Sequence, residues 1–181
     1  MQEIKRYEIL DGLPRYGPMY FPVTENGKPF YSEGFAVRFY KSDGTDWVAN
    51  FKPGFTGLNK IMETADWDKL LVFAGGTCYL MNPDEIKPLK CFGISFYNII
   101  ESAERTLILQ DYTDFTIVEF SGLVWRSERI SWDGFKDVTL NGDLVTGLSF
   151  DATDSNNEWK PFAFNIKTKE ITGGSYSNRN V

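Results

Sequence analysis

Residues 70–81 read LLVFAGGTCYLM, two apolar runs of five residues separated by Gly75-Gly76. A two-residue turn between antiparallel strands favours type I′ geometry, which requires positive φ at both central residues, and glycine takes that conformation at little cost. The stretch therefore predicts a β-hairpin. Asn26-Gly27, Asp43-Gly44 and Asn141-Gly142 lie between similar apolar or alternating runs. Together the four pairs predict an antiparallel meander.

The strand that opens this hairpin recurs at a fixed spacing. Leu70, Leu107 and Leu144 are each separated by 37 residues, and each begins a run with strand chemistry, followed by a turn and a second such run. One further step back reaches Glu33, where SEGFAVRFY opens another hairpin. Residues 33–181 are therefore interpreted as four units of about 37 residues, a period typical of β-repeat architectures.

Alternation of side chains supports strands over helices. In FAVRFY, Phe35, Val37 and Phe39 point to one side and the residues between them to the other. Two segments, 58–65 and 96–105, instead carry apolar residues at helical spacing over two turns at most. Each is interpreted either as a short helix or as a strand, and strands ending at Glu63 and Glu101 agree better with the repeat.

These signals predict an all-β fold, an antiparallel meander of about four blade-like units arranged as in a propeller, with a closed or partial ring. A twisted β-sandwich, or an α+β fold with one or two short helices, is the alternative. Residues 1–32 contain Pro14, Pro18 and Pro22, too many prolines for a central strand. They are expected to form an extended arm that packs on a repeated β domain spanning residues 33–181.

Several segments also carry a resemblance to known proteins. FNIKTKEITGG (164–174) resembles the third strand and turn of many β-propeller blades. The combination of SEGFAVRF, WVANF, RISWDG and ITGGSY resembles a group of small bacterial all-β proteins whose function is not known. The resemblance implies a blade-like fold and brings no activity with it.

Composition excludes several chemistries. The chain of 181 residues has no histidine, which removes Ser-His and Cys-His nucleophile pairs and His-ligated metal sites. A formal net charge of −6 disfavours nucleic acid and anionic membranes as partners. No glycine-rich phosphate loop precedes a helix pattern, so no nucleotide or other cofactor is expected.

Cysteine usage and the lack of long apolar runs indicate a compartment. Cys78 and Cys91 lie in apolar contexts and are interpreted as reduced, buried thiols, with a single bridge between them as the alternative. The first 17 residues have no apolar run long enough for a signal peptide, and no stretch approaches the roughly 20 apolar residues of a membrane span. A cytoplasmic protein is therefore expected.

The segment LVWRSERISWDG (123–134) has the highest density of chemically active side chains. Strand alternation would place Trp125 and Arg129 on one face, forming an aromatic and cationic patch suited to a protein partner or a planar anionic ligand. The alternative is that Trp125 belongs to the core and Arg129 pairs with a carboxylate. The candidate binding residues are Trp125, Arg126, Arg129, Trp132 and Asp133.

Other charged groups are weaker candidates. The loop at 151–158 has oxygen ligands for calcium but lacks the EF-hand order, so a solvated hairpin loop is favoured and no metal site is expected. Asp111 and Asp114 are an acid/base pair or, more often, turn residues. Glu33 and Arg38 are interpreted as a buried or a rim ion pair.

Two functions remain open. The first is a noncatalytic protein-interaction or ligand-binding module, of the kind found among bacterial immunity or accessory binding proteins, whose partner is another protein or, less directly, a small molecule. The second is a carboxylate-dependent enzyme acting on a carbohydrate, which would require two acids among Asp111, Asp114, Asp133 and Asp151 to converge within about 5–10 Å.

Overall fold

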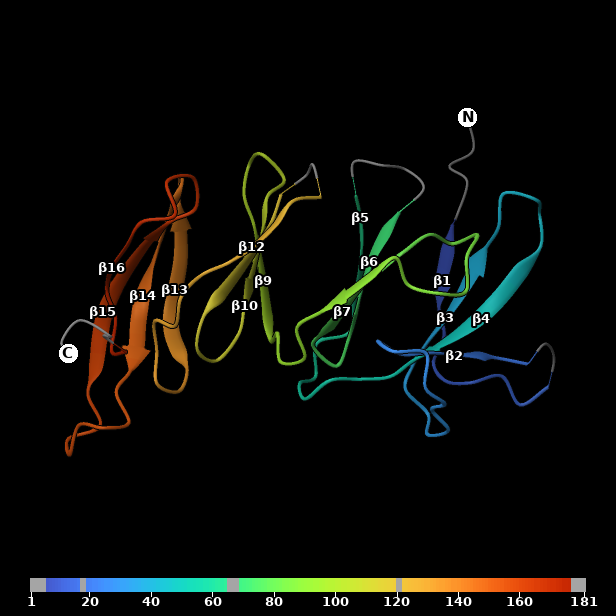
Figure 1. Cartoon of the computed structure of the whole chain (residues 1–181), viewed down its shortest axis with the longest axis horizontal. Coiled ribbons are helices and arrows are strands. Elements are labelled where there is room, and N and C mark those ends of the chain that lie inside the picture. Colours follow the sequence, from blue (N-terminus) through green and yellow to red (C-terminus); the bar gives the residue numbers. More distant parts are fainter. Residues whose placement is uncertain (1–5, 17–18, 65–68, 120–121, 177–181) are drawn as a thin grey trace. The chain divides into compact units, whose positions relative to one another are not determined.

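The computed structural model describes residues 6–16, 19–64, 69–119 and 122–176, and the protein is all-β. These residues contain sixteen strands and no helix, so the α+β alternative is not what the chain adopts. The strands form four four-stranded sheets. The chain divides between Phe96 and Tyr97 into two compact units, each with two of the sheets (Figure 1).

The first unit contains sheets A and B. Sheet A consists of β1 (Tyr7–Ile9), β2 (Phe21–Val23), β3 (Phe35–Tyr40) and β4 (Asp46–Phe51), in the order β1-β3-β4-β2. Its pairs are antiparallel except β2–β4, which is parallel. Sheet B is an antiparallel meander of β5 (Lys60–Glu63), β6 (Leu70–Ala74), β7 (Thr77–Met81) and β8 (Lys90–Phe92).

The second unit contains sheets C and D, and both are antiparallel meanders. Sheet C consists of β9 (Asn98–Glu101), β10 (Leu107–Gln110), β11 (Phe115–Val118) and β12 (Val124–Arg126). Sheet D consists of β13 (Phe135–Asn141), β14 (Leu144–Phe150), β15 (Trp159–Asn165) and β16 (Ile171–Gly173).

The spacing of 37 residues corresponds to the distance along the chain between equivalent strands. Leu70, Leu107 and Leu144 begin β6, β10 and β14, and each of these is the second strand in its sheet. In sheet A the second position belongs to β3, which begins at Phe35, two residues after the predicted Glu33. One repeat is therefore one four-stranded sheet.

The segments with ambiguous periodicity are strands. β5 ends at Glu63 and β9 ends at Glu101, as the repeat predicts. Ile61 pairs with Val72, and Ile100 pairs with Ile108, so both segments complete the edge of a sheet. Residue 65, the last of the first segment, lies outside the described residues. Tertiary pairing overrides the weak helical spacing here, because a helix would leave β6 and β10 each without a paired strand on one side.

The glycine turns agree with the prediction only in part. Gly75 and Gly76 both have positive φ, 54° and 86°, and join β6 to β7 as a two-residue turn. Gly142 joins β13 to β14, but the turn residues are Gly142 and Asp143, and only the glycine has positive φ. That is the pattern of a type II′ turn, one residue later than expected.

The two earlier pairs differ more. Gly44 is the fourth residue of a five-residue connection between β3 and β4, in which its N–H bonds to the carbonyl of Lys41 and the Lys41 N–H bonds to the carbonyl of Thr45. The expected hairpin at Asn26-Gly27 is wrong, since β2 pairs with β4 and the chain forms no strand between Gly27 and β3. A two-residue signal cannot show that the next strand pairs elsewhere.

The first 32 residues contribute both edge strands of sheet A. β1 pairs with β3 and β2 pairs with β4. Pro22 lies in β2, where an edge position tolerates the missing N–H. Pro18 and residues 1–5 lie outside the described residues. The segment that follows is held by the fully buried Asn50, whose amide accepts from the Gly34 N–H at 2.8 Å and donates to the Ser32 carbonyl at 2.9 Å.

Each unit has its own apolar core between its two sheets. In the first unit, Phe39, Phe51 and Tyr79 form ring contacts at 5.1–6.1 Å between sheets A and B. In the second, Phe115 contacts Phe162 at 5.6 Å and anchors the core between sheets C and D. Aromatic rings at these separations add to the burial of their apolar area.

The structure decides two predictions about pairs of side chains, the bridge between Cys78 and Cys91 and the ion pair between Glu33 and Arg38. Cys78 is buried, Cys91 is half-buried and both thiols are free. Cys78 pairs with Phe92, so it lies on the opposite face of sheet B from Cys91, and the bridge considered as an alternative does not form. Arg38 instead contacts Glu8 and Asp46, while Glu33 accepts from the Leu13 N–H.

The described residues include no helix with the length and apolar character needed to cross a membrane.

Candidate functional site

The predicted alternation along 123–134 stops at the end of β12. Beyond Arg126 the chain is no longer a strand, and it bonds to the first residue of β11 and to the turn between β10 and β11. The Ser127 N–H donates to the Phe115 carbonyl at 2.8 Å, and the Ile130 N–H donates to the Thr113 carbonyl at 2.8 Å. Trp125 and Arg129 therefore do not share one strand face, and the expected patch between them does not form.

Trp125 belongs to the core of the second unit. Its ring stacks on Phe164 at 5.6 Å with an interplanar angle of 18°, and Lys169 Nζ lies 5.2 Å from the centre of the indole ring. The half-buried Trp125 packs against the core cluster. Trp125 therefore packs on the core, as the alternative expected, while it stays half-buried.

Arg126 is committed to an ion pair. Its Nε and one terminal nitrogen bond to the two carboxylate oxygens of Asp114 at 2.8 and 2.7 Å. The hydrogen bond to Asp114 raises the pKa of the Arg126 guanidinium. Asp114 is buried, so this bidentate contact compensates its charge. Arg126 stabilises the hairpin of β10 and β11, and its charge is compensated by Asp114.

Arg129, Trp132 and Tyr176 form a compact surface group, here called the Arg129 cluster. The Arg129 guanidinium carbon lies 5.1 Å from the centre of the Trp132 ring and 4.6 Å from that of Tyr176. The two rings meet edge to face at 4.6 Å. Cation–π contacts of this kind hold a guanidinium in place without neutralising it.

Two backbone carbonyls fix the orientation of the same guanidinium. Arg129 Nε donates to the Ser131 carbonyl at 3.0 Å, and a terminal nitrogen donates to the Trp132 carbonyl at 2.7 Å. A guanidinium has five N–H groups, so these bonds leave several for a ligand. The Arg129 side chain is exposed, while both rings are half-buried.

The backbone under the cluster is tied to sheet D. The Trp132 N–H donates to the Phe150 carbonyl at 3.3 Å, and the Tyr176 N–H donates to the Ile130 carbonyl at 3.0 Å. The buried Ser131 hydroxyl donates to the Gly134 carbonyl at 2.6 Å. The cluster therefore lies on two segments that backbone hydrogen bonds hold in place, the 127–134 connection and the segment after β16.

Arg129 has no acidic partner within the part of the chain that the structure describes. The ion pairs there involve Arg6, Arg38, Arg126 and three lysines, and none reaches Arg129. The expected alternative, a pairing with a carboxylate inside a sheet, is wrong. Asp133 is exposed and follows Trp132 directly, so a negative charge borders the cluster.

The structure thus brings two of the five candidate residues, Arg129 and Trp132, into one group, with Asp133 beside it. Sequence reasoning missed Tyr176. Its segment ITGGSY gives no signal for a role, because the contact with Arg129 spans 47 positions and depends on the return of the chain after β16.

The remaining acids serve local structure. Asp111 accepts from the Tyr112 N–H at 2.6 Å, and its own N–H donates to the Asp114 carbonyl, which closes the turn between β10 and β11. Asp151 bonds to Lys160 and to Thr153. Lys160 lowers the pKa of the Asp151 carboxyl to about 2.

The loop at 151–158 is the hairpin loop between β14 and β15, where Asp154 accepts from the Asn156 N–H at 2.8 Å. Within the described ranges, no group of three or more acidic or cysteine side chains is placed to hold a metal ion.

Comparisons with known proteins do not add an assignment. The chain matches no protein-family model and no curated protein sequence.

Proposed function

We propose that this protein is a noncatalytic binding module whose Arg129 cluster receives a carboxylate of another protein. The observation that carries the proposal is a guanidinium held by two rings and two carbonyls, exposed to solvent and without an acidic partner among the described residues. Elsewhere the same chain gives Arg38 and Arg126 carboxylate partners.

The composition of the cluster fits an interface. Tryptophan, tyrosine and arginine are the residues most enriched among those that dominate binding energy. Because Arg129 is already oriented, binding would cost little side-chain entropy, which favours affinity. A guanidinium also recognises a carboxylate through two parallel N–H bonds, so a terminal carboxylate or an Asp or Glu side chain is the matching group.

The charge around the cluster narrows the partner further. The chain carries a net charge of −6, which repels strongly acidic proteins over long distances. Asp133 adds a negative charge at the rim of the cluster. The proposed partner therefore presents a single carboxylate on a surface that is otherwise neutral or basic, and not an acidic tract.

The architecture, the biological role and the cellular compartment are part of the same proposal. Four tandem four-stranded sheets support a blade-like, propeller-related architecture. Together with the resemblance to small bacterial proteins, they support a bacterial immunity or accessory binding role in the cytoplasm. A scaffold of this kind presents connections between strands to a partner, as the 127–134 connection presents Arg129.

Affinity capture from the source organism tests the proposal when it is done with matched variants. The wild-type chain, Arg129→Gln and Trp132→Ala are immobilised in parallel, and Arg15→Gln serves as the control, because Arg15 is an exposed arginine in the first unit. We expect one protein that wild type and Arg15→Gln retain and the two cluster variants lose.

Calorimetry with the purified partner then measures how much each substitution weakens binding. Losing a charge-assisted bidentate contact at an interface is expected to weaken binding by roughly 10- to 100-fold for Arg129→Gln. If every variant retains the same proteins as the wild type, or if the partner binds Arg129→Gln with unchanged affinity, the cluster is not the binding site.

A further inference from the structure

The face of sheet D that points away from its core is exposed and uncovered among the described residues. The register places Leu144, Leu148, Phe150, Trp159, Pro161 and Ala163 on it, while Val145, Phe162 and Phe164 point into the core. Leu144 is 40% exposed and Trp159 is 36% exposed. This set of outward positions is called the outer face of sheet D.

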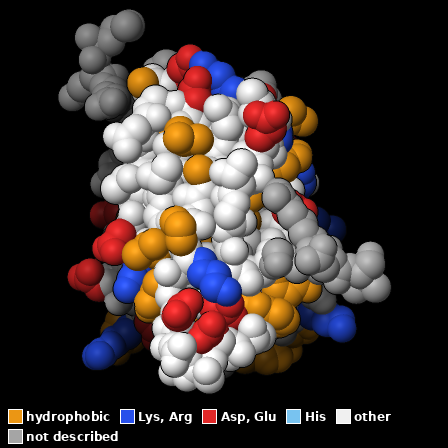
Figure 2. All heavy atoms as spheres, turned by 90° about the vertical axis from the view of Figure 1, so that its left-hand side faces the viewer, with side chains coloured by type: hydrophobic (Ala, Val, Ile, Leu, Met, Phe, Trp, Pro, Cys, Tyr) orange, Lys and Arg blue, Asp and Glu red, His pale blue; other side chains and the backbone are white. Residues whose placement is uncertain are grey.

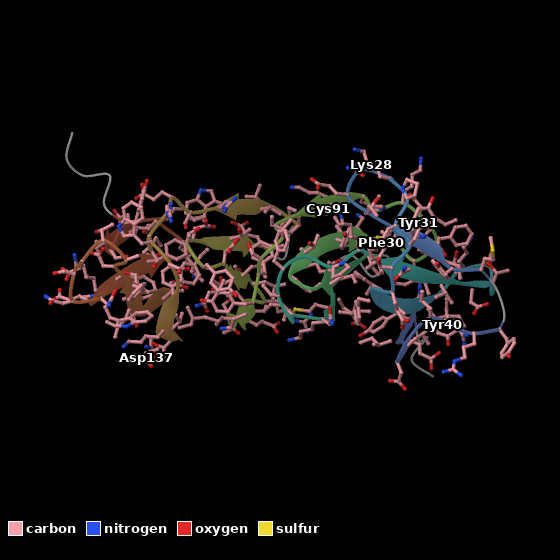
Figure 3. All side chains as sticks on the ribbon, turned by 90° about the horizontal axis from the view of Figure 1, so that it is seen from below. Lys28, Phe30, Tyr31, Tyr40, Cys91 and Asp137 are labelled. Carbon is pink, nitrogen blue, oxygen red and sulfur yellow. The ribbon has the colours of Figure 1, made fainter. Side chains whose placement is uncertain are left out.

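The outer face of sheet D is almost free of charge. Its other paired strand positions carry threonine or asparagine, and Lys136 is the one charged residue. Lys136 Nζ lies 4.3 Å from the centre of the Trp159 ring. Figure 2 shows this side of the unit, with uncharged side chains across the middle and charged ones toward the ends. Asp137 lies at the margin of the second unit, in the bulge of β13 (Figure 3).

Sheet A differs in this respect. On its face away from the core, Arg38 contacts Glu8 at 3.7 Å and Asp46 at 3.2 Å, and the Tyr40 hydroxyl donates to Glu8 at 2.7 Å. Asn50 ties residues 32–34 over the rest of that face. Tandem-repeat proteins usually end in a repeat with a polar outer surface. Sheet A has such a surface, and sheet D does not.

We infer that the outer face of sheet D docks against the same face of a second copy of this chain, related by a twofold axis. A face whose paired strand positions carry one charged residue, Lys136, meets its own copy with little like-charge repulsion, although each chain carries a net charge of −6. Head-to-tail docking of sheet D on sheet A would instead desolvate the Arg38 ion pairs, which is costly. The geometry therefore selects a closed dimer over a filament.

The size of the face sets the strength of the dimer. Three strands of seven residues and one of three, about 4.8 Å apart and rising about 3.4 Å per residue, span on the order of 400 Å² per copy, half of the roughly 800 Å² of a standard interface. We expect a reversible dimer with a Kd on the order of 10–1,000 μM. The inference goes beyond the proposed binding function and does not depend on Arg129.

Sedimentation equilibrium with a charge-swap series tests the dimer. Thr146 lies near the middle of the outer face, and its hydroxyl is 3.2 Å from that of Thr139. Thr146→Glu and Thr146→Lys each bring like charges together across a twofold axis, so each alone should weaken the dimer at least about tenfold. An equimolar mixture of the two should recover association to within about threefold of wild type.

Controls separate this result from misfolding and from the proposed function. Phe55→Glu changes an 80% exposed aromatic residue in the first unit and should dimerise as wild type does. Arg129→Gln should also dimerise normally. Thermal melts must show that both Thr146 variants are folded, and Thr172→Glu offers a second exposed position on the face if one is not. A wild-type chain that stays monomeric at about 1 mM, or a dimer that the swap leaves unchanged, overturns the inference.

Discussion

The turn at Gly75-Gly76 makes a steric prediction that a second glycine of the chain can calibrate. Gly76 and Gly44 have nearly the same positive φ, 86° and 83°. A Cβ at Gly76 would lie 2.5 Å from the Phe96 carbonyl oxygen and 2.5 Å from Thr56 Oγ1, whereas a Cβ at Gly44 would meet nothing within 4 Å. Alanine at the two positions therefore meets a different amount of space at nearly the same φ.

The expected cost follows from that difference. Both alanine variants pay about 1–2 kcal/mol for the left-handed conformation. Gly76→Ala must also displace the segment at Phe96, which bonds to the Gly76 carbonyl at 3.2 Å and to the Thr56 hydroxyl at 2.6 Å. Overpacking costs about 1–3 kcal/mol and a strained hydrogen bond about 1 kcal/mol. Gly76→Ala should lose roughly 2–4 kcal/mol more than Gly44→Ala.

Urea unfolding followed by circular dichroism measures both free energies of unfolding in the same buffer. The comparison within one protein cancels errors of extrapolation that the two variants share. If Gly76→Ala costs no more than Gly44→Ala, then the turn does not pack against residues 54–58 and 94–96, and the account of the first unit fails.

Three further outcomes follow from buried polar groups. Asn50→Ala leaves the Gly34 N–H and the Ser32 carbonyl unpaired and should lower the free energy of unfolding by about 2–4 kcal/mol in urea titrations. A loss below about 0.5 kcal/mol would contradict the role of Asn50 in holding this segment. The folded-state pKa of Asp151 is depressed from 3.8 to about 2, so its contribution is present above pH 4 and is lost as the pH falls toward 2. Melting curves of Asp151→Asn and wild type should therefore converge near pH 2, and a constant offset would refute the Lys160 pair. Burial raises the pKa of Cys91 to about 12, so at pH 8 iodoacetamide should label the native thiol roughly 10³ times more slowly than the unfolded one, and equal rates would contradict the burial.

The repeat and most strands could be predicted from sequence because local and periodic signals agree. The 37-residue spacing fixes the second strand of three sheets, and alternation gives the bounds of β3 (35–40) as observed. The order of sheet A could not be predicted. Strand β2 ends 23 residues before β4 begins and pairs with it in parallel. No local pattern in the sequence predicts which strand β2 pairs with.

The candidate site was predictable only in outline. The dense segment 123–134 contains Arg129 and Trp132, but the assumption of one continuous strand placed Trp125 beside Arg129. The strand ends at Arg126, and the backbone beyond it bonds to Phe115 and Thr113, so the alternation stops before Arg129. Tyr176 reaches Arg129 only through the fold, so the cluster as a whole required the structure.

The most direct measurement of the binding role is photo-crosslinking from the position beside the cluster. A benzophenone amino acid replaces the exposed Asp133, and a control carries it at the exposed Phe55 in the first unit. In living cells we expect position 133 to give one covalent adduct with another protein, the adduct to disappear when Arg129→Gln is added, and position 55 to give none. An adduct that persists without Arg129, or none at all from position 133, would contradict a partner bound at this cluster.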